Sequence, residues 1–121
     1  MNKIELENRL IAFAVEIMNI SEKITNNKSG GYLNGQLVRS GNSSALNYGE
    51  AQSAESTGDF VHKLKVILKE LRETYINLKI TKQAKLCEND AELDKLIKEH
   101  CGLNAIFVKS IDAATNKKGK R

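Results

Sequence analysis

Residues 3–25 read KIELENRLIAFAVEIMNISEKIT, and this stretch decides the fold. Large apolar side chains recur along it at intervals of four, three, four, three and four residues. The members of this row are Leu6, Leu10, Phe13, Ile17, Ile20 and Ile24. Because an α-helix turns by about 100° per residue, such a row forms one continuous stripe of the kind that packs in helix bundles. The stretch predicts a first helix over about residues 3–25.

A second apolar set lies beside this row on the same helix. It comprises Ile4, Ile11, Ala14, Val15 and Met18. The two sets together cover well over half of the helix circumference, whereas one buried face needs an apolar stripe only a little wider than about 100°. The helix is therefore either unusually deep in the bundle or covered by a second chain. We favour the second chain, with Ile4, Ile11, Val15 and Met18 at the interface between copies.

Three further amphipathic segments follow, and residues 26–31, with Gly30 and Gly31, predict the first break. We expect helices over about residues 32–54, 57–81 and 90–115. The expected inner face of the last helix comprises Leu93, Leu96, Ile97, Cys101, Phe107, Val108 and Ile111. Short connections force neighbouring helices to run antiparallel. The sequence thus predicts an all-α, antiparallel up-and-down four-helix bundle over residues 1–116, followed by a basic tail at 117–121.

Composition narrows the classes of protein further. The chain has 121 residues, of which 40% are hydrophobic and 28% charged, so one domain with an aliphatic core is expected. Proline is absent, which suits long uninterrupted helices. No apolar run approaches the about 20 residues of a membrane-spanning helix. Because no secretory signal precedes Cys87 and Cys101, we expect a cytoplasmic protein with two free thiols.

A row of cations lies on the third predicted helix. Its members, His62, Lys65, Lys69, Arg72 and Lys79, fall within about 100° of arc along the edge of the apolar face. Such a row could follow a phosphate backbone, although cations on bundle helices commonly form only a solvated face. Further cations end the chain, namely Lys117, Lys118, Lys120 and Arg121. Except for His62, these cations are candidate RNA contacts in a chain with a formal net charge of +4.

A polar stripe crosses the second predicted helix at spacings of three, four, four and three residues. It comprises Gln36, Arg39, Ser43, Asn47 and Glu50. Glu70, Arg72 and Glu73 of the third helix are candidate partners. The stripe is either a polar groove that binds a ligand or a hydrogen-bonded network that sets the helix register. We favour the structural interpretation.

Patterns that carry catalysis or metal binding are not found. A di-iron bundle uses Glu-x-x-His pairs, whereas the residues three before His100 and His62 are isoleucine and aspartate. His100 and Cys101 are adjacent, so on a helix they point about 100° apart and form no catalytic dyad. We expect His100 at the boundary of the core, and no enzyme activity, cofactor or metal site.

Residues 36–51 read QLVRSGNSSALNYGEA. This segment resembles the signature of the bacterial four-helix bundle proteins encoded in intervening sequences of 23S ribosomal RNA genes, also called S23 ribosomal proteins. The family pattern is similar to Q-L-x-R-[AS]-[AG]-x-S-x-x-x-N-x-x-E-[GA], and the polar stripe occupies its polar positions. Further matches follow at Ser56, Asp59, Phe60, Glu70 and Glu73. The chain departs from the pattern at Ala51, where many members have glycine, and in lacking their usual proline in the second helix.

The resemblance implies a homopentamer, which would cover the second apolar set of the first helix. It also implies kinship with the accessory proteins of diversity-generating retroelements, which share the bundle and the pentamer. Those proteins bind a reverse transcriptase and nucleic acid through basic surfaces. We therefore expect an oligomeric, RNA-associated binding protein with RNA or a reverse transcriptase as partner. The alternative is a protein–protein assembly module without a nucleic-acid role.

Overall fold

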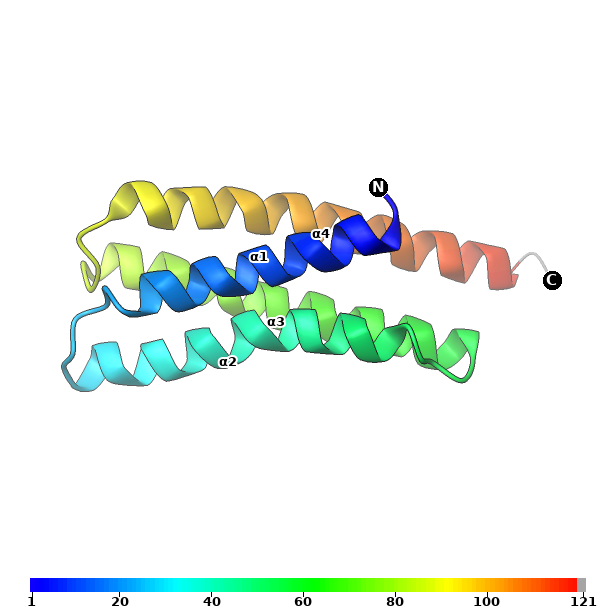
Figure 1. Cartoon of the computed structure of the whole chain (residues 1–121), viewed down its shortest axis with the longest axis horizontal. Coiled ribbons are helices and arrows are strands. Elements are labelled where there is room, and N and C mark those ends of the chain that lie inside the picture. Colours follow the sequence, from blue (N-terminus) through cyan, green and yellow to red (C-terminus); the bar gives the residue numbers. More distant parts are fainter. Residues whose placement is uncertain (120–121) are drawn as a thin grey trace.

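The computed structural model describes residues 1–119, with side chains through residue 116. Its four helices are α1 (Lys3–Ser21), α2 (Lys28–Ala51), α3 (Thr57–Gln83) and α4 (Asp90–Gly119). Each helix packs on the next in the chain, and α4 closes the bundle against α1 (Figure 1). Consequently α1 and α3 occupy opposite corners, as do α2 and α4. The predicted all-α, up-and-down four-helix bundle is confirmed.

A polar side chain caps the start of each helix by accepting a hydrogen bond from a backbone N–H of the first turn. Asn2 and Glu5 form a reciprocal capping box at α1, and Ser56 accepts the Asp59 N–H at 3.0 Å before α3. At α4 the Asn89 side chain accepts the Glu92 N–H at 3.1 Å, as the spacing of these two residues predicts. The caps therefore define helix starts that the sequence already indicates.

Helix α2 begins at Lys28, four residues before the predicted start, because Asn27 caps it. The Asn27 side chain accepts the Gly30 N–H at 2.7 Å, so Gly30 and Gly31 belong to the first turn and do not form a helix stop. A Cβ atom at Gly30 would collide with the backbone oxygen of Thr25. Glycine at this position allows the loop after α1 to pass directly over the start of α2.

The other helix boundaries also differ from those expected. Helix α1 ends at Ser21, and the next residues cross to the loop after α3, where Ile24 forms an isolated antiparallel bridge with Cys87. Helix α4 continues through Gly119, four residues beyond the predicted end. The predicted basic tail of Lys117, Lys118, Lys120 and Arg121 falls outside the residues whose side chains are described.

The core is aliphatic and is built on the row that residues 3–25 predict. All six members of that row are buried. On α4 the inner face differs from the prediction, because Cys101 and Val108 are exposed. The buried row of α4 comprises Leu93, Leu96, His100, Leu103 and Phe107. Within residues 1–119 no helix combines the length and apolarity that crossing a bilayer requires.

Candidate functional site

The second apolar set of α1 lies on the outside of the bundle. Ile4 is 64% exposed, Ile11 48%, Val15 44% and Met18 41%, whereas Ala14 of the same set is buried. We call these four exposed residues the α1 outer row. Helix α1 is therefore not unusually deep in the bundle, and the described part of the chain leaves the outer row uncovered.

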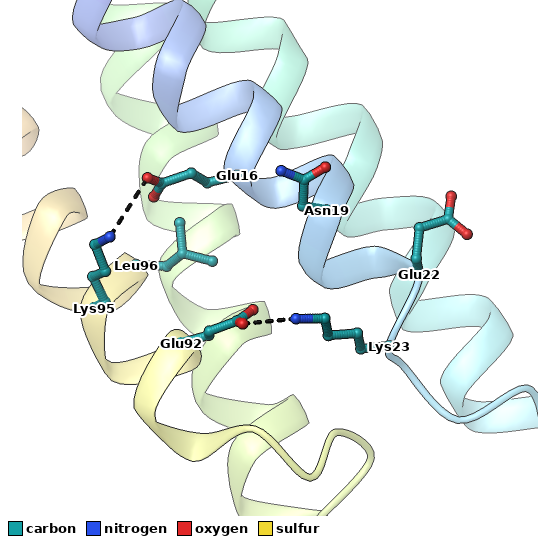
Figure 2. A pocket seen from close by; sticks show the side chains of 7 residues that line it. All are labelled: Glu16, Asn19, Glu22, Lys23, Glu92, Lys95 and Leu96. Atoms are coloured by element: carbon teal, nitrogen blue, oxygen red, sulfur yellow. Dashed lines mark hydrogen bonds and ion pairs between the residues drawn. The ribbon is translucent and has the colours of Figure 1, made fainter.

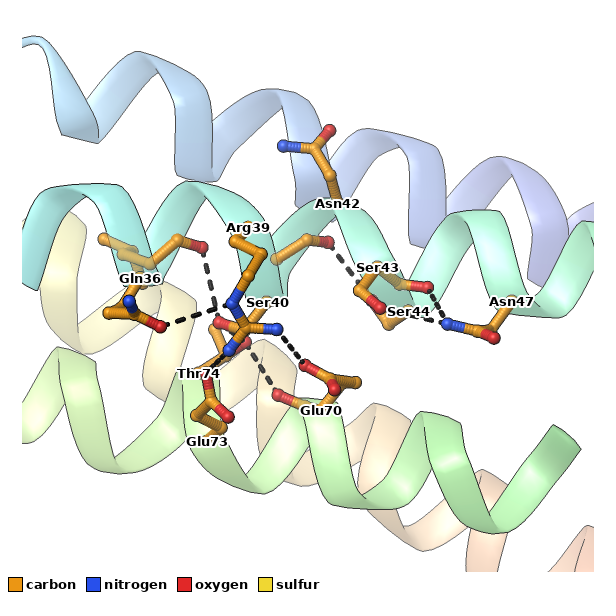
Figure 3. A network of polar contacts seen from close by, with 12 residues as sticks. Gln36, Arg39, Ser40, Asn42, Ser43, Ser44, Asn47, Glu70, Glu73 and Thr74 are labelled. Carbon is orange, nitrogen blue, oxygen red and sulfur yellow. Dashed lines mark hydrogen bonds and ion pairs between the residues drawn. The ribbon is translucent and has the colours of Figure 1, made fainter. Parts of the chain in front are cut away.

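Arg39 connects the polar stripe of α2 to α3 (Figure 3). Its guanidinium donates to the Gln36 side chain at 3.2 Å and pairs with Glu70 at 3.0 Å and also with Glu73. The Glu70 carboxylate is nearly buried, so its charge needs this partner. Arg72, the third candidate partner on α3, forms no contact of this kind in the part of the chain that the structure describes.

The remaining stripe residues have partners within α2 or on α3. The Asn47 side chain donates to the backbone oxygen and the hydroxyl of Ser43, both at 2.9 Å, within α2. Glu50 lies 3.8 Å from the ammonium of Lys63 on α3. These polar groups thus bond to one another or across the α2–α3 contact.

Buried polar residues that sequence reasoning missed lie between the same two helices. The hydroxyls of Ser40 and Thr74 are fully buried and 2.8 Å apart, and the Thr74 hydroxyl also lies 2.9 Å from the Glu70 backbone oxygen. Farther along, the Asn77 amide donates to the Leu33 backbone oxygen at 2.9 Å. We call these contacts, together with those of Arg39, the polar seam. Their signal in the sequence is positional, since Ser40 and Thr74 follow buried leucines at a spacing of three.

The cations predicted on α3 form an exposed row, which we call the basic edge: Lys65, Lys69, Arg72 and Lys79. Among the described residues, none of these four forms an ion pair. The Lys79 ammonium lies 5.1 Å from the centre of the Tyr75 ring. Because Glu70 and Glu73 turn toward Arg39 on α2, the basic edge has no acidic partner from the middle of its own helix.

His100 lies inside the bundle and not at its boundary, which corrects the prediction. Its ring stacks on Tyr75 of α3 with centroids 4.6 Å apart, and neither ring nitrogen has a hydrogen-bond partner among the described residues. Burial, and then the charge of Arg72, hold the pKa of the His100 imidazole below its ordinary value. Cys101 is exposed while His100 is buried, so the two side chains point to different sides of α4.

A shallow groove of about 490 Å³ runs between α1 and α4, the pair of neighbouring helices that packs least closely. Charged side chains bridge it, with Lys23 and Glu92 2.7 Å apart and Lys95 and Glu16 3.9 Å apart (Figure 2). These pairs join the two helices across the groove. Within residues 1–119, no three His, Cys, Asp or Glu side chains gather in a way that could hold a metal ion.

Comparison with known proteins identifies the fold and the family. No curated protein matches the sequence. The chain is similar to the crystal structure of a protein of unknown function from the S23 ribosomal protein family of Bacteroides thetaiotaomicron VPI-5482, with a TM-score of 0.83 and 26% sequence identity. That similarity covers 93% of this chain and 99% of the other. The sequence model described as 23S rRNA-intervening sequence protein matches residues 2–108, and the chain accordingly belongs to this family.

Proposed function

We propose that this chain is a non-enzymatic, oligomeric protein that binds RNA through the basic edge of α3. The observation that carries the proposal is the arrangement of two unpartnered surfaces on opposite corners of the bundle. The outward face of α1 carries the four exposed apolar side chains of the outer row, whereas the outward face of α3 carries the four cations of the basic edge. Copies whose α1 outer row packs on a face of the neighbouring chain other than α3 leave the basic edge accessible to a second partner.

The spacing of the basic edge suits a polyanion. At about 1.5 Å per residue, its four cations are separated along the helix axis by about 6, 4.5 and 10 Å, and the row spans about 21 Å. Because these cations form no ion pairs within the described residues, contact with phosphates would not have to break existing ones. Neutralising phosphates with such side chains releases counterions, which is the main source of affinity for nucleic acid.

The α1 outer row supports the assembly part of the proposal. Four large apolar side chains, each between 41% and 64% exposed, follow one another over four turns of α1. Several exposed large apolar side chains on one side of a helix are typical of an interface between proteins. The family resemblance implies a pentamer, and a ring of copies would present several basic edges to one RNA, which raises its avidity.

The polar groups of the described residues support a role without catalysis. Three of the carboxylates are engaged, since Glu70 and Glu73 pair with Arg39 and Glu92 pairs with Lys23. His100 is buried away from solvent and lies apart from the thiol of Cys101.

RNA affinity tests the proposal when it is measured as a function of salt. We expect the wild-type chain to bind a structured RNA with an affinity that falls steeply between roughly 50 and 200 mM salt. Replacing Lys65, Lys69 and Arg72 together by alanine should reduce the slope of log affinity against log salt by about 2 to 3, because about one counterion is released per phosphate contact. Fluorescence anisotropy of a labelled RNA provides the measurement.

A matched triple variant controls for net charge. Lys28, Lys98 and Lys109 are exposed on α2 and α4, and replacing them by alanine removes the same total charge. If both triple variants weaken binding equally, the basic edge is not the RNA site. A wild-type chain that binds no RNA would favour the alternative, in which the α1 outer row serves a protein–protein assembly module and the polar seam is purely structural.

A further inference from the structure

A second recognition element lies beside the basic edge. The start of α2 and the C-terminal half of α3 enclose an open groove of about 440 Å³. Its lining comprises Tyr32, Leu33, Gln36, Arg72, Glu73, Ile76, Asn77 and Ile80. Arg72 thus belongs both to this groove and to the basic edge. We call it the Tyr32 groove.

The groove has an apolar, aromatic wall that nothing in the described chain covers. Tyr32 is 68% exposed, and Ile76 and Ile80 of α3 are also exposed. The other two tyrosines are engaged, because Tyr48 is buried and Tyr75 stacks on His100. Tyr32 is therefore the tyrosine of this chain whose ring is available to a ligand.

Some polar groups of the groove already have hydrogen-bond or ion-pair partners within the chain, whereas others could bind a ligand. Glu73 is held by Arg39, and Asn77 bonds at both ends of its amide, to the Leu33 oxygen and to Thr81. The Gln36 oxygen accepts from Arg39, while its amide nitrogen donates to no partner among the described residues. The groove thus offers one amide donor and the guanidinium of Arg72, which is unpaired within the described residues, next to an exposed aromatic ring.

We propose that the Tyr32 groove holds one unpaired base of an RNA whose phosphates lie along the basic edge. The base would stack on the Tyr32 ring against Ile76 and Ile80, its edge would accept from the Gln36 amide, and an adjacent phosphate would pair with Arg72. Aromatic side chains recognise splayed-out RNA bases by stacking, whereas a base inside a duplex has no free face. This inference rests on the proposed RNA binding and adds a preference for bulged or looped RNA.

Two hairpin RNAs that differ by a single bulged 2-aminopurine test the inference. Wild-type protein should bind the bulged hairpin more tightly than the fully paired one and should quench the 2-aminopurine fluorescence. Tyr32→Ala should weaken binding of the bulged hairpin by roughly 5- to 150-fold, the range expected for one lost stacking contact, and leave the paired hairpin unaffected. Tyr32→Phe keeps the ring and should behave as wild type.

Leu46→Ala is the matched control, because Leu46 is also 68% exposed on α2. If Tyr32→Ala weakens both hairpins equally or neither, the base site is excluded while binding through the basic edge stands. If wild-type protein binds neither hairpin, the proposed function fails and the base site with it. If Tyr32→Ala lowers the mass of the protein measured by light scattering, the groove is an interface between copies, and the inference is overturned.

Discussion

The buried hydroxyl pair of the polar seam allows a quantitative test of what the polar contacts between α2 and α3 contribute to stability. Thr74→Val removes one hydroxyl and keeps the shape of the side chain. It leaves the Ser40 hydroxyl fully buried with only a long contact of 3.4 Å to the Leu37 backbone oxygen. A buried polar group without a good partner costs about 1–3 kcal/mol, so we expect the free energy of unfolding to fall by that amount.

The reverse change should be milder. Ser40→Ala leaves the Thr74 hydroxyl bonded to the Glu70 backbone oxygen at 2.9 Å, and alanine is the better helix former by about 0.5 kcal/mol. In the double variant both polar groups are gone, which is close to neutral when the shapes are kept. The double variant should therefore be more stable than Thr74→Val alone.

Urea unfolding followed by circular dichroism measures these differences at one fixed chain concentration, because stability of an oligomer depends on concentration. RNA affinity should be unchanged in all three variants, since the pair is buried and lies away from the basic edge. If the two single effects add within about 0.5 kcal/mol, the hydroxyls are energetically independent. That result would contradict a stabilising hydrogen bond between Ser40 and Thr74.

Two other predictions concern the helix contacts. Gly41→Ala should destabilise the bundle by about 1–2 kcal/mol, because the new Cβ would lie 2.9 Å from a methyl group of Ile17. A Cβ at Gly35 meets nothing within 4 Å, so Gly35→Ala should stabilise the bundle by about 1 kcal/mol. Thermal unfolding ranks the two variants, and equal effects would contradict the close approach of α1 and α2 at Gly41. For His100, the unfolded chain takes up a proton below pH of about 6.5, while the folded chain resists it because burial lowers the pKa. The free energy of unfolding is therefore independent of this group above a pH of about 6.5 and falls as the pH drops from there toward the lower folded-state pKa. His100→Gln should remove this pH dependence in urea unfolding and the exposed control His62→Gln should keep it, so an unchanged profile in His100→Gln would exclude the imidazole as its source.

Periodicity predicts the fold well because burial dominates helix packing. The six-residue row of α1 could be identified directly, since each member is large and apolar. On α4 the same rule placed Cys101 inside because it is more apolar than its neighbour. Continuing the spacing of three and four from Leu96 leads instead to His100 and Leu103, both of which are buried. At this position the helical spacing decides which side chain is buried, although histidine is polar. Stacking on Tyr75 gives the buried imidazole ring a packing partner.

The contacts of the polar seam could not be predicted from the sequence. Ser40 and Thr74 look like weak helix formers in the sequence, and only the distance between them reveals a partnered, buried pair. Gly30 likewise has the composition of a loop but lies in the first turn of α2, because Asn27 caps the helix three residues earlier. Contacts between residues distant in the chain, and local caps, decide these positions. Side-chain type alone does not.

Both proposed roles, RNA binding and protein–protein assembly, require that copies of the chain cover the α1 outer row. Sedimentation velocity of the full chain at micromolar concentration tests this requirement directly. We expect a mass several times the 13.5 kDa of one chain, and we expect Ile11→Asn combined with Val15→Asn to lower the mass while the helical circular dichroism is kept. A wild-type chain that sediments as a 13.5 kDa monomer would contradict the account.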